Sequence, residues 1–210
     1  MLTILAIMVV SYIIGSFPTS IIVGKILRGI DIREHGSGNA GGTNVFRVLG
    51  WKPGLLVMLV DVFKGFAATY WIPSQLAPLS NHLPLLQLLA GIAAVVGHIW
   101  TVFAGFRGGK GVGTAAGMLL ALFPQALIYC LLVFLLVLAA TRIVSISSMM
   151  GAITLPIVLS VFKYGLDKPV PLPLFIFSFF AAALIIYTHR ANIKRLLNGT
   201  ENRFGRSKKA

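Results

Sequence analysis

The chain has 210 residues, of which 57% are apolar and 11% are charged, and its mean hydropathy is +0.91. A soluble domain carries about 25% charged residues, so this composition excludes a soluble globular protein and indicates a membrane protein. The net charge of +13 would suggest a nucleic-acid partner in a soluble chain. Here the Lys and Arg residues lie between and after the apolar segments. We therefore expect no nucleic-acid partner and assign these residues to membrane orientation and anionic ligands.

The apolar segments predict membrane-spanning helices, each of which needs about 20 apolar residues. The clear candidates, in chain order, are Leu2–Val23, Leu55–Ile72, Leu83–Phe103, Ile146–Phe162 and Leu172–Thr188. Another segment, Val112–Ala140, is too long for one upright helix and too short for two full ones. Pro124 lies near its middle, where it should break or kink a helix.

The distribution of Lys and Arg decides how often Val112–Ala140 crosses the membrane, because these residues collect in cytoplasmic loops. If the segment is a hairpin of two short helices that turns at Pro124, all Lys and Arg residues except Lys64, Lys163 and Lys168 lie in the cytoplasm. We therefore predict an all-α integral membrane protein with seven transmembrane helices. Its N-terminus lies outside and its C-terminus is cytoplasmic.

The first predicted cytoplasmic loop is rich in glycine and short polar side chains. It contains four glycines within the seven residues from Gly36 to Gly42. Such a backbone can approach a ligand closely, and its amides can form an anion-binding nest. Its candidate substrate contacts are Ser37, Gly38, Asn39, Thr43, Asn44 and Arg47. The alternative is a flexible loop without a ligand. The G-x-G-x-x-G spacing follows an apolar helix and not a strand, so a dinucleotide fold is not expected.

A second cytoplasmic segment, Gly97–Thr114, places Lys110 among glycines at a predicted helix start, which favours a phosphate ligand. Its candidate contacts are Arg107, Gly108, Gly109, Lys110 and Gly111. A Walker nucleotide site is not supported, because Ala104 and Gly111 stand where that pattern needs Gly and Ser or Thr.

Other polar and small residues near these segments have structural interpretations. Glycines recur every fourth residue from position 105 to 117, and Gly113 and Gly117 could pack a helix face closely against a neighbour. Asp61 and Lys64 lie three residues apart in the second span and predict an internal ion pair, while a role in a site stays open. His98 is interpreted as an anchor at the membrane interface.

The third candidate segment follows the last span, over residues 187–195. His189 and Asn192 lie three apart, so a helix would put them on one face as candidate ligand contacts. Ser145, in the short inner turn that begins at Thr141, could add a hydroxyl. The basic residues of the C-terminal tail, which include Arg206, Lys208 and Lys209, are expected to meet anionic lipid head groups at about 1 kcal/mol each.

The chain lacks the residues of several catalytic classes. With only five acidic residues, a metal site of clustered carboxylates is hard to build, and we expect no metal and no cofactor. No His is followed by an acid five residues later, and no Gly-x-Ser-x-Gly elbow is present. An enzyme of this composition would depend on positioning and charge stabilisation more than on a strong protein base.

These segments together carry a resemblance to a known family. The chain resembles the bacterial acyl-phosphate:glycerol-3-phosphate acyltransferases (the PlsY family). The likeness runs from Ser11–Ser16 through the loop Gly36–Arg47 and the segment Gly97–Thr114 to His189–Glu201. It implies a single transmembrane acyltransferase domain over residues 1–210, in the bacterial inner membrane with the site facing the cytoplasm.

The resemblance also implies a reaction and its partners. A fatty acyl group would pass from acyl phosphate to the 1-hydroxyl of glycerol 3-phosphate, among membrane lipids, giving lysophosphatidic acid and phosphate. The residues expected to act in catalysis are Ser37, Arg47, Lys110, His189 and Asn192. The substrate-binding residues would be Gly38, Asn39, Thr43, Asn44, Arg107, Gly108, Gly109, Gly111 and Ser145. The alternatives from other classes are a phosphate transporter or channel and a lipid-binding structural subunit.

Overall fold

The computed structural model describes residues 1–204, and within that range every regular element is helical. The chain forms two compact units, Met1–Phe123 and Pro124–Ala210. The tail residues Arg206, Lys208 and Lys209 lie outside the described range.

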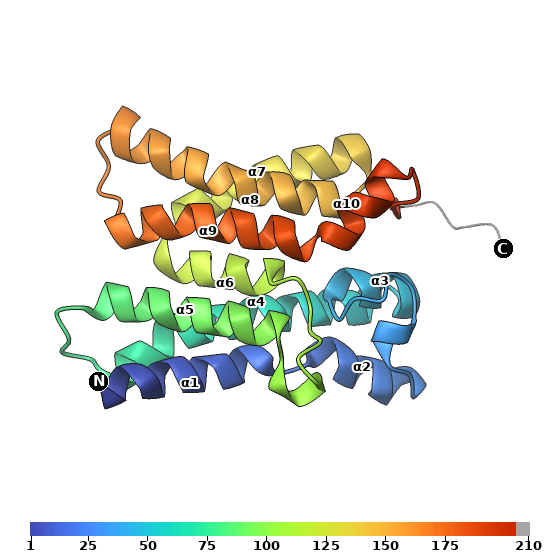
Figure 1. The fold of residues 1–210 in the computed structure, drawn as a ribbon, viewed down its shortest axis with the longest axis horizontal. Coiled ribbons are helices and arrows are strands. Elements are labelled where there is room, and N and C mark those ends of the chain that lie inside the picture. The colour runs from blue at the N-terminus through green and yellow to red at the C-terminus, as the bar shows by residue number, and fades with distance from the viewer. Residues whose placement is uncertain (205–210) are drawn as a thin grey trace. The chain divides into compact units, whose positions relative to one another are not determined.

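The first unit is a bundle of apolar helices with two polar loops. Its elements are α1 (Leu2–Ser16), α2 (Thr19–Arg28), η1 (Ile32–Glu34), α3 (Gly42–Leu49), α4 (Trp51–Leu76), α5 (Leu83–Ile99), η2 (Val102–Ala104) and α6 (Val112–Leu122). Helix α4 packs against α6, α3 and α5, and α1 packs against α5. In Figure 1 the long helices of this unit run side by side, and α2 and α3 lie at one end of the bundle.

Glycines allow the helices of the first unit to touch backbone to backbone. A Cβ at Gly15 of α1 would overlap the backbone of Ala94 in α5. A Cβ at Gly117 of α6 would likewise overlap the backbone of Val62 in α4, and one at Gly113 would lie 3.3 Å from Asp61 Cβ. The predicted packing role of Gly113 and Gly117 is therefore confirmed.

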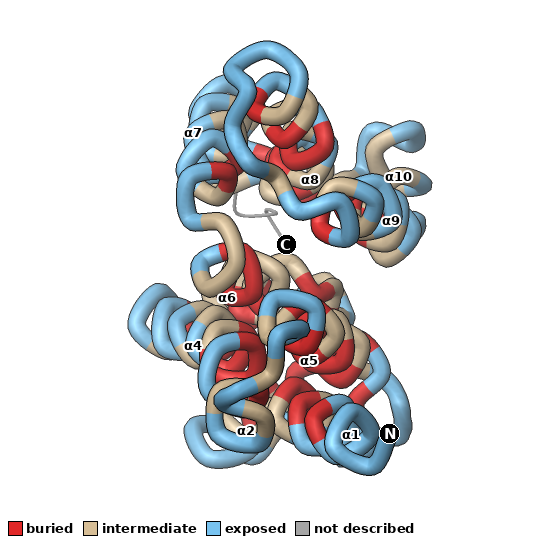
Figure 2. Tube along the Cα trace, turned by 90° about the vertical axis from the view of Figure 1, so that its left-hand side faces the viewer, coloured by how far each residue is buried: buried red, intermediate tan, exposed pale blue. Residues whose placement is uncertain are grey.

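In its described part, residues 124–204, the second unit contains three long helices and a short one. They are α7 (Pro124–Thr141), α8 (Val144–Ser160), which continues as the π-helical turn η3 (Val161–Gly165), α9 (Leu172–Thr188) and α10 (Arg190–Leu197). Helix α8 packs against both α7 and α9, and α10 is bent by 57° from α9. Figure 2 shows that the buried residues of each unit lie where its own helices meet, while the outer helix faces are exposed.

Exposed apolar faces of this kind fit a bilayer. Five helical stretches within residues 1–204 are long and apolar enough to cross a membrane: Leu2–Arg28, Trp51–Leu76, Leu83–Ala104, Pro124–Thr141 and Val144–Gly165. The bent pair α9–α10 passes the same test as one span, and α6 is a shorter apolar helix. The prediction of an all-helical membrane protein is confirmed at this level.

Two details of the predicted spans were wrong. The segment predicted as one helix over Leu2–Val23 breaks at Phe17 and resumes as α2, because Pro18 has no N–H to donate and restricts the residue before it. The chain does break at Phe123, before Pro124, as predicted, but the helix that follows is not short. Helix α7 has 18 residues, against 11 in α6.

Candidate active site

The first glycine-rich loop is organised by the side chain of Asn44, which is 1% exposed. Its amide nitrogen donates to the carbonyl oxygens of Ile32 at 2.9 Å and His35 at 3.0 Å, and its Oδ1 accepts from the N–H of Ser37 at 2.7 Å. Gly36, at φ +62°, leaves room for this amide, since a Cβ there would overlap Asn44 Oδ1. Asn44 therefore holds the loop together, and its predicted contact with a substrate remains a prediction.

The other candidates of this loop lie along the same short segment. Gly38 is exposed at φ +73°, a left-handed conformation that favours glycine. Ser37 and Asn39 are partly buried beside it. Thr43 lies in the first turn of α3, and Arg47 lies in its last turn. The loop thus presents short polar groups and one guanidinium within a single ordered stretch.

Arg33 joins the first loop to the second. Its guanidinium forms a fork on Asp31, with Nε 3.1 Å from Oδ1 and Nη2 2.7 Å from Oδ2. Its Nη1 donates to the carbonyl oxygens of Ala104 at 2.8 Å and Arg107 at 3.3 Å. The hydrogen bonds from Arg33 lower the pKa of Asp31 to about 2, against the desolvation by burial that would raise it. The Arg107 side chain itself is exposed.

The second loop is fixed by its own backbone. The N–H of Gly108 donates to the carbonyl of Ile99, and the N–H of Gly109 donates to the carbonyl of His98, both at 3.0 Å. These two amides are committed to carbonyl oxygens. A backbone contact with phosphate in this loop would therefore come from the amides after Gly109, including that of Gly111, which caps the start of α6 at φ +84°. The side chains of Arg107 and Lys110 remain predicted contacts.

The two loops touch at Gly109. A Cβ there would overlap His98 Nε2 and would lie 2.7 Å from the carbonyl oxygen of Ala40. Only glycine fits between the first loop and the His98 ring. Two of the three candidate segments are thereby brought together within the first unit.

Beneath this contact lies a small cavity with buried charged groups in its walls. Asp61 and Lys64 line it, together with His98, Thr19 and Gly109. The Lys64 ammonium lies 2.8 Å from Asp61 Oδ1, which confirms the predicted ion pair, and His98 Nδ1 lies 3.6 Å from the same oxygen. His98 is only 7% exposed, so its interpretation as an interface anchor was wrong.

The third candidate segment belongs to the second unit. His189 is 2% exposed and lies between α9 and α10. Its Nδ1 is 2.7 Å from the carbonyl oxygen of Ile185. A carbonyl only accepts, so Nδ1 carries the proton, and in the neutral ring Nε2 is the acceptor.

A carboxylate joins the other two candidates of this unit. Glu201 Oε1 accepts from Asn192 Nδ2 at 2.6 Å and from Ser145 Oγ at 3.0 Å, and its Oε2 accepts from Arg195 Nε at 2.7 Å. Burial acts to raise the pKa of Glu201, but the hydrogen bonds from Arg195, Asn192 and Ser145 outweigh it. The pKa therefore lies below its ordinary value. Ser145 and Asn192 are brought together, as hydrogen-bond partners of one acid.

Comparisons with known proteins identify the family. Residues 5–199 match the family described as glycerol-3-phosphate acyltransferase. The chain belongs to this family. The glycerol-3-phosphate acyltransferase of Chlorobium chlorochromatii is 52% identical, with 97% of each chain covered. That of Chlorobaculum tepidum is also 52% identical, over 98% of this chain and 99% of its own.

Two solved structures share the fold of this acyltransferase family member. One is PlsY (YgiH), an integral membrane glycerol 3-phosphate acyltransferase, in its glycerol 3-phosphate form, with a TM-score of 0.85 and 38% identity over 96% of both chains. The other is the lysophosphatidic acid form, with a TM-score of 0.82 and 37% identity over 96% of this chain and 95% of the other.

Sequence reasoning about this acyltransferase missed residues that support the candidate site. His98 was not connected with Asp61, because its position two residues before Trp100 indicated an interface. Glu201 was not named as a site residue. Two signals could have found it. Glu201 is one of only five acidic residues in the chain, and it follows the cation Arg195 by six positions.

Proposed function

We propose that the protein transfers a fatty acyl group from acyl phosphate to the 1-hydroxyl of glycerol 3-phosphate, giving lysophosphatidic acid and inorganic phosphate. The observation that carries this proposal is the similarity to glycerol-3-phosphate acyltransferases over nearly the whole chain. The related PlsY structures, in glycerol 3-phosphate and lysophosphatidic acid forms, hold an acceptor and a product of this type.

The chemistry needs little from a protein base. The glycerol hydroxyl oxygen attacks the acyl carbonyl carbon, and the bond from that carbon to the phosphate oxygen breaks. The hydroxyl proton passes to the departing phosphate. Acyl phosphate is a mixed anhydride and is already activated, so no covalent acyl-enzyme is required.

Cations and fixed dipoles are the groups that such a reaction needs. In the proposal, Arg47 and Lys110 stabilise the negative charge on the phosphate oxygens. Ser37, Asn39 and Thr43 add hydrogen-bond donors. The contact between the two loops at Gly109 and Ala40 supports their joint use.

His189 and Asn192 are assigned to glycerol 3-phosphate. Their separation by three residues and their fixed partners, the Ile185 carbonyl and Glu201, support preorganised contacts. An amide NH₂ has two donors, so the bond from Asn192 to Glu201 uses one of them. Ser145 contributes through the same carboxylate.

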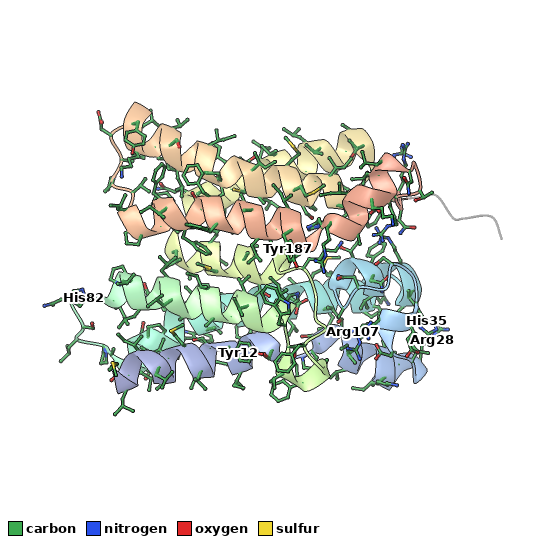
Figure 3. All side chains as sticks on the ribbon, viewed as in Figure 1. Tyr12, Arg28, His35, His82, Arg107 and Tyr187 are labelled. Atoms are coloured by element: carbon green, nitrogen blue, oxygen red, sulfur yellow. The ribbon has the colours of Figure 1, made fainter. Side chains whose placement is uncertain are left out.

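For the membrane arrangement, we propose seven spans with the N-terminus outside and the candidate site in the cytoplasm of a bacterial cell, at the inner membrane. The five long apolar stretches, the bent α9–α10 pair and the shorter α6 supply this number of segments. Within the first unit, Figure 3 places Arg28 and His35 at one end and His82 at the other. That separation agrees with one basic, cytoplasmic end.

The proposal is tested with the purified protein, acyl phosphate and glycerol 3-phosphate, by following lysophosphatidic acid and phosphate together. Equal amounts of both products are expected, and glycerol in place of glycerol 3-phosphate should give a much lower rate. Sealed vesicles that accumulate phosphate without turnover would favour the transporter instead. Absence of both activities would favour a structural subunit.

A further inference from the structure

Three ionisable side chains are buried together in the first unit. Asp61, Lys64 and His98 are 5%, 5% and 7% exposed. Isolated charges inside membrane helices are costly and are kept only when they are paired or functional. A simple brace for helix α4 would need only the 2.8 Å pair of Asp61 with Lys64, yet the same carboxylate oxygen also faces His98 Nδ1 at 3.6 Å.

Contacts from this cluster lead to two irregular parts of the backbone. The Lys64 ammonium donates to the carbonyl oxygen of Phe17 at 3.0 Å, where the chain breaks between α1 and α2. At the other end, the His98 carbonyl accepts from the Gly109 N–H. His98 Nε2 lies directly against Gly109, where a Cβ would overlap it. His98 therefore contacts Gly109 through both its ring and its backbone.

The two ring nitrogens of His98 have different surroundings. Nδ1 faces the acid, and Nε2 faces the glycine before Lys110. A carboxylate near one nitrogen favours the proton on that nitrogen and orients the imidazole. At 3.6 Å the contact of His98 with Asp61 is electrostatic and not a hydrogen bond. Without the charge of Asp61, the His98 ring that contacts Gly109 would lose this electrostatic constraint.

We propose that Asp61 is a positioning residue, which acts through His98 to set the place of the Gly109–Lys110 backbone, and hence of the Lys110 ammonium, for acyl transfer. This inference rests on the function proposed above. It assigns to the buried ion pair a role in the reaction beyond bracing helix α4.

The test is a double-mutant cycle on kcat/KM with Asp61→Asn and Lys110→Ala in the purified protein. In the parent chain, Asp61→Asn should lower kcat/KM about tenfold, since small displacements of a binding group have effects of this size. In the Lys110→Ala background, the same change should cost about twofold or less, because coupled residues do not act additively. A purely structural role would give the same factor in both backgrounds and would overturn the proposal.

A second variant covers the case in which Asp61→Asn does not fold. The pair Asp61→Leu with Lys64→Leu removes both charges together, which leaves no unpaired buried ion. This double variant should also lower kcat/KM about tenfold in the parent chain and about twofold or less in the Lys110→Ala background. Thr69→Val is the matched control, because Thr69 is fully buried in the same helix and its hydroxyl donates to the Gly65 carbonyl of its own helix. It should keep near-parent activity, and a loss equal to that of Asp61→Asn would contradict the inference.

The parent protein separates this inference from the function on which it rests. A parent without acyl transfer refutes both. An active parent with additive effects of Asp61 and Lys110 refutes the positioning role alone.

Discussion

Each unit of the chain places a carboxylate behind its candidate binding residues, and the two units use it differently. In the first unit, Asp61 lies beneath the loops and reaches Gly109 through His98. In the second unit, Glu201 accepts hydrogen bonds from Ser145 and Asn192 themselves.

This difference has a consequence for how the two units respond to substitution. In the first unit the carboxylate of Asp61 is not itself a predicted binding group, although Asn44 both holds its loop together and is a predicted contact. In the second unit the predicted contacts themselves bond to the carboxylate, so a change there should cost stability and activity together.

A large effect is expected at the contact between the loops. Gly109→Ala places a methyl group against His98 Nε2 and 2.7 Å from the Ala40 carbonyl, so a loop must move. We expect kcat/KM to fall by roughly 10²-fold, as for displacements near 1 Å. Gly165→Ala is the control, because its Cβ would make an ordinary contact at 3.9 Å. Similar activity in both variants would show that the contact is unimportant.

The second unit should respond in stability first. Glu201→Gln removes the anion that Arg195, Asn192 and Ser145 contact. The substitution weakens three hydrogen bonds and should cost about 2 kcal/mol in total, which lowers Tm by roughly 4–8 °C in a chain of this size. Thermal unfolding in detergent measures this shift, and an unchanged Tm would mean that the network does not stabilise the second unit.

The same network gives a pH dependence with a defined sign. The pKa of Glu201 is lower in the folded protein than its ordinary value of 4.5. The contribution of the ionised Glu201 to the free energy of unfolding is therefore complete above about pH 4.5. It is lost as the pH falls through the pKa of the folded state. The Tm difference between the parent chain and Glu201→Gln should shrink on acidification from pH 6. A difference that grows would contradict the assigned direction.

A smaller effect is expected for Ser145→Ala, which removes one hydrogen bond to Glu201 and leaves those from Asn192 and Arg195. One such bond contributes about 1 kcal/mol, or roughly 2–4 °C in Tm. Ser160→Ala in the same helix is the control, because Ser160 bonds only to the carbonyl of Pro156. A larger loss for the control would remove the reason to connect Ser145 with Glu201.

Much of the fold could be predicted from the sequence, because apolar runs of membrane length are a local signal. The last span was predicted as Leu172–Thr188, which are the bounds of α9. The break at Pro18 was missed because the apolar run continues through Phe17 and Pro18. Proline lacks a backbone N–H, and a count of apolar residues does not detect this. The start of α7 was predicted from Pro124, and its end at Thr141 lies one residue beyond the predicted segment. Only the description of this helix as short was wrong.

The candidate site could be predicted only in part. Glycine-rich loops and cations are visible along the chain, and the structure brings the first two of them together. The support was not visible, because it joins distant positions. Asp61 and His98 lie on different helices, and Ser145 lies 56 residues from Glu201. A polar residue in an apolar run carries no sign of a partner on another helix, whereas a pair on one helix, such as Asp61 and Lys64, can be predicted from its spacing.

The most direct test of the central claim is the kcat/KM of purified Arg47→Ala and Lys110→Ala with acyl phosphate and glycerol 3-phosphate. If these cations stabilise phosphate charge during the reaction, each variant should lose about 10²-fold or more while remaining folded. Near-parent kcat/KM in both variants would contradict the claim that they bind the phosphates.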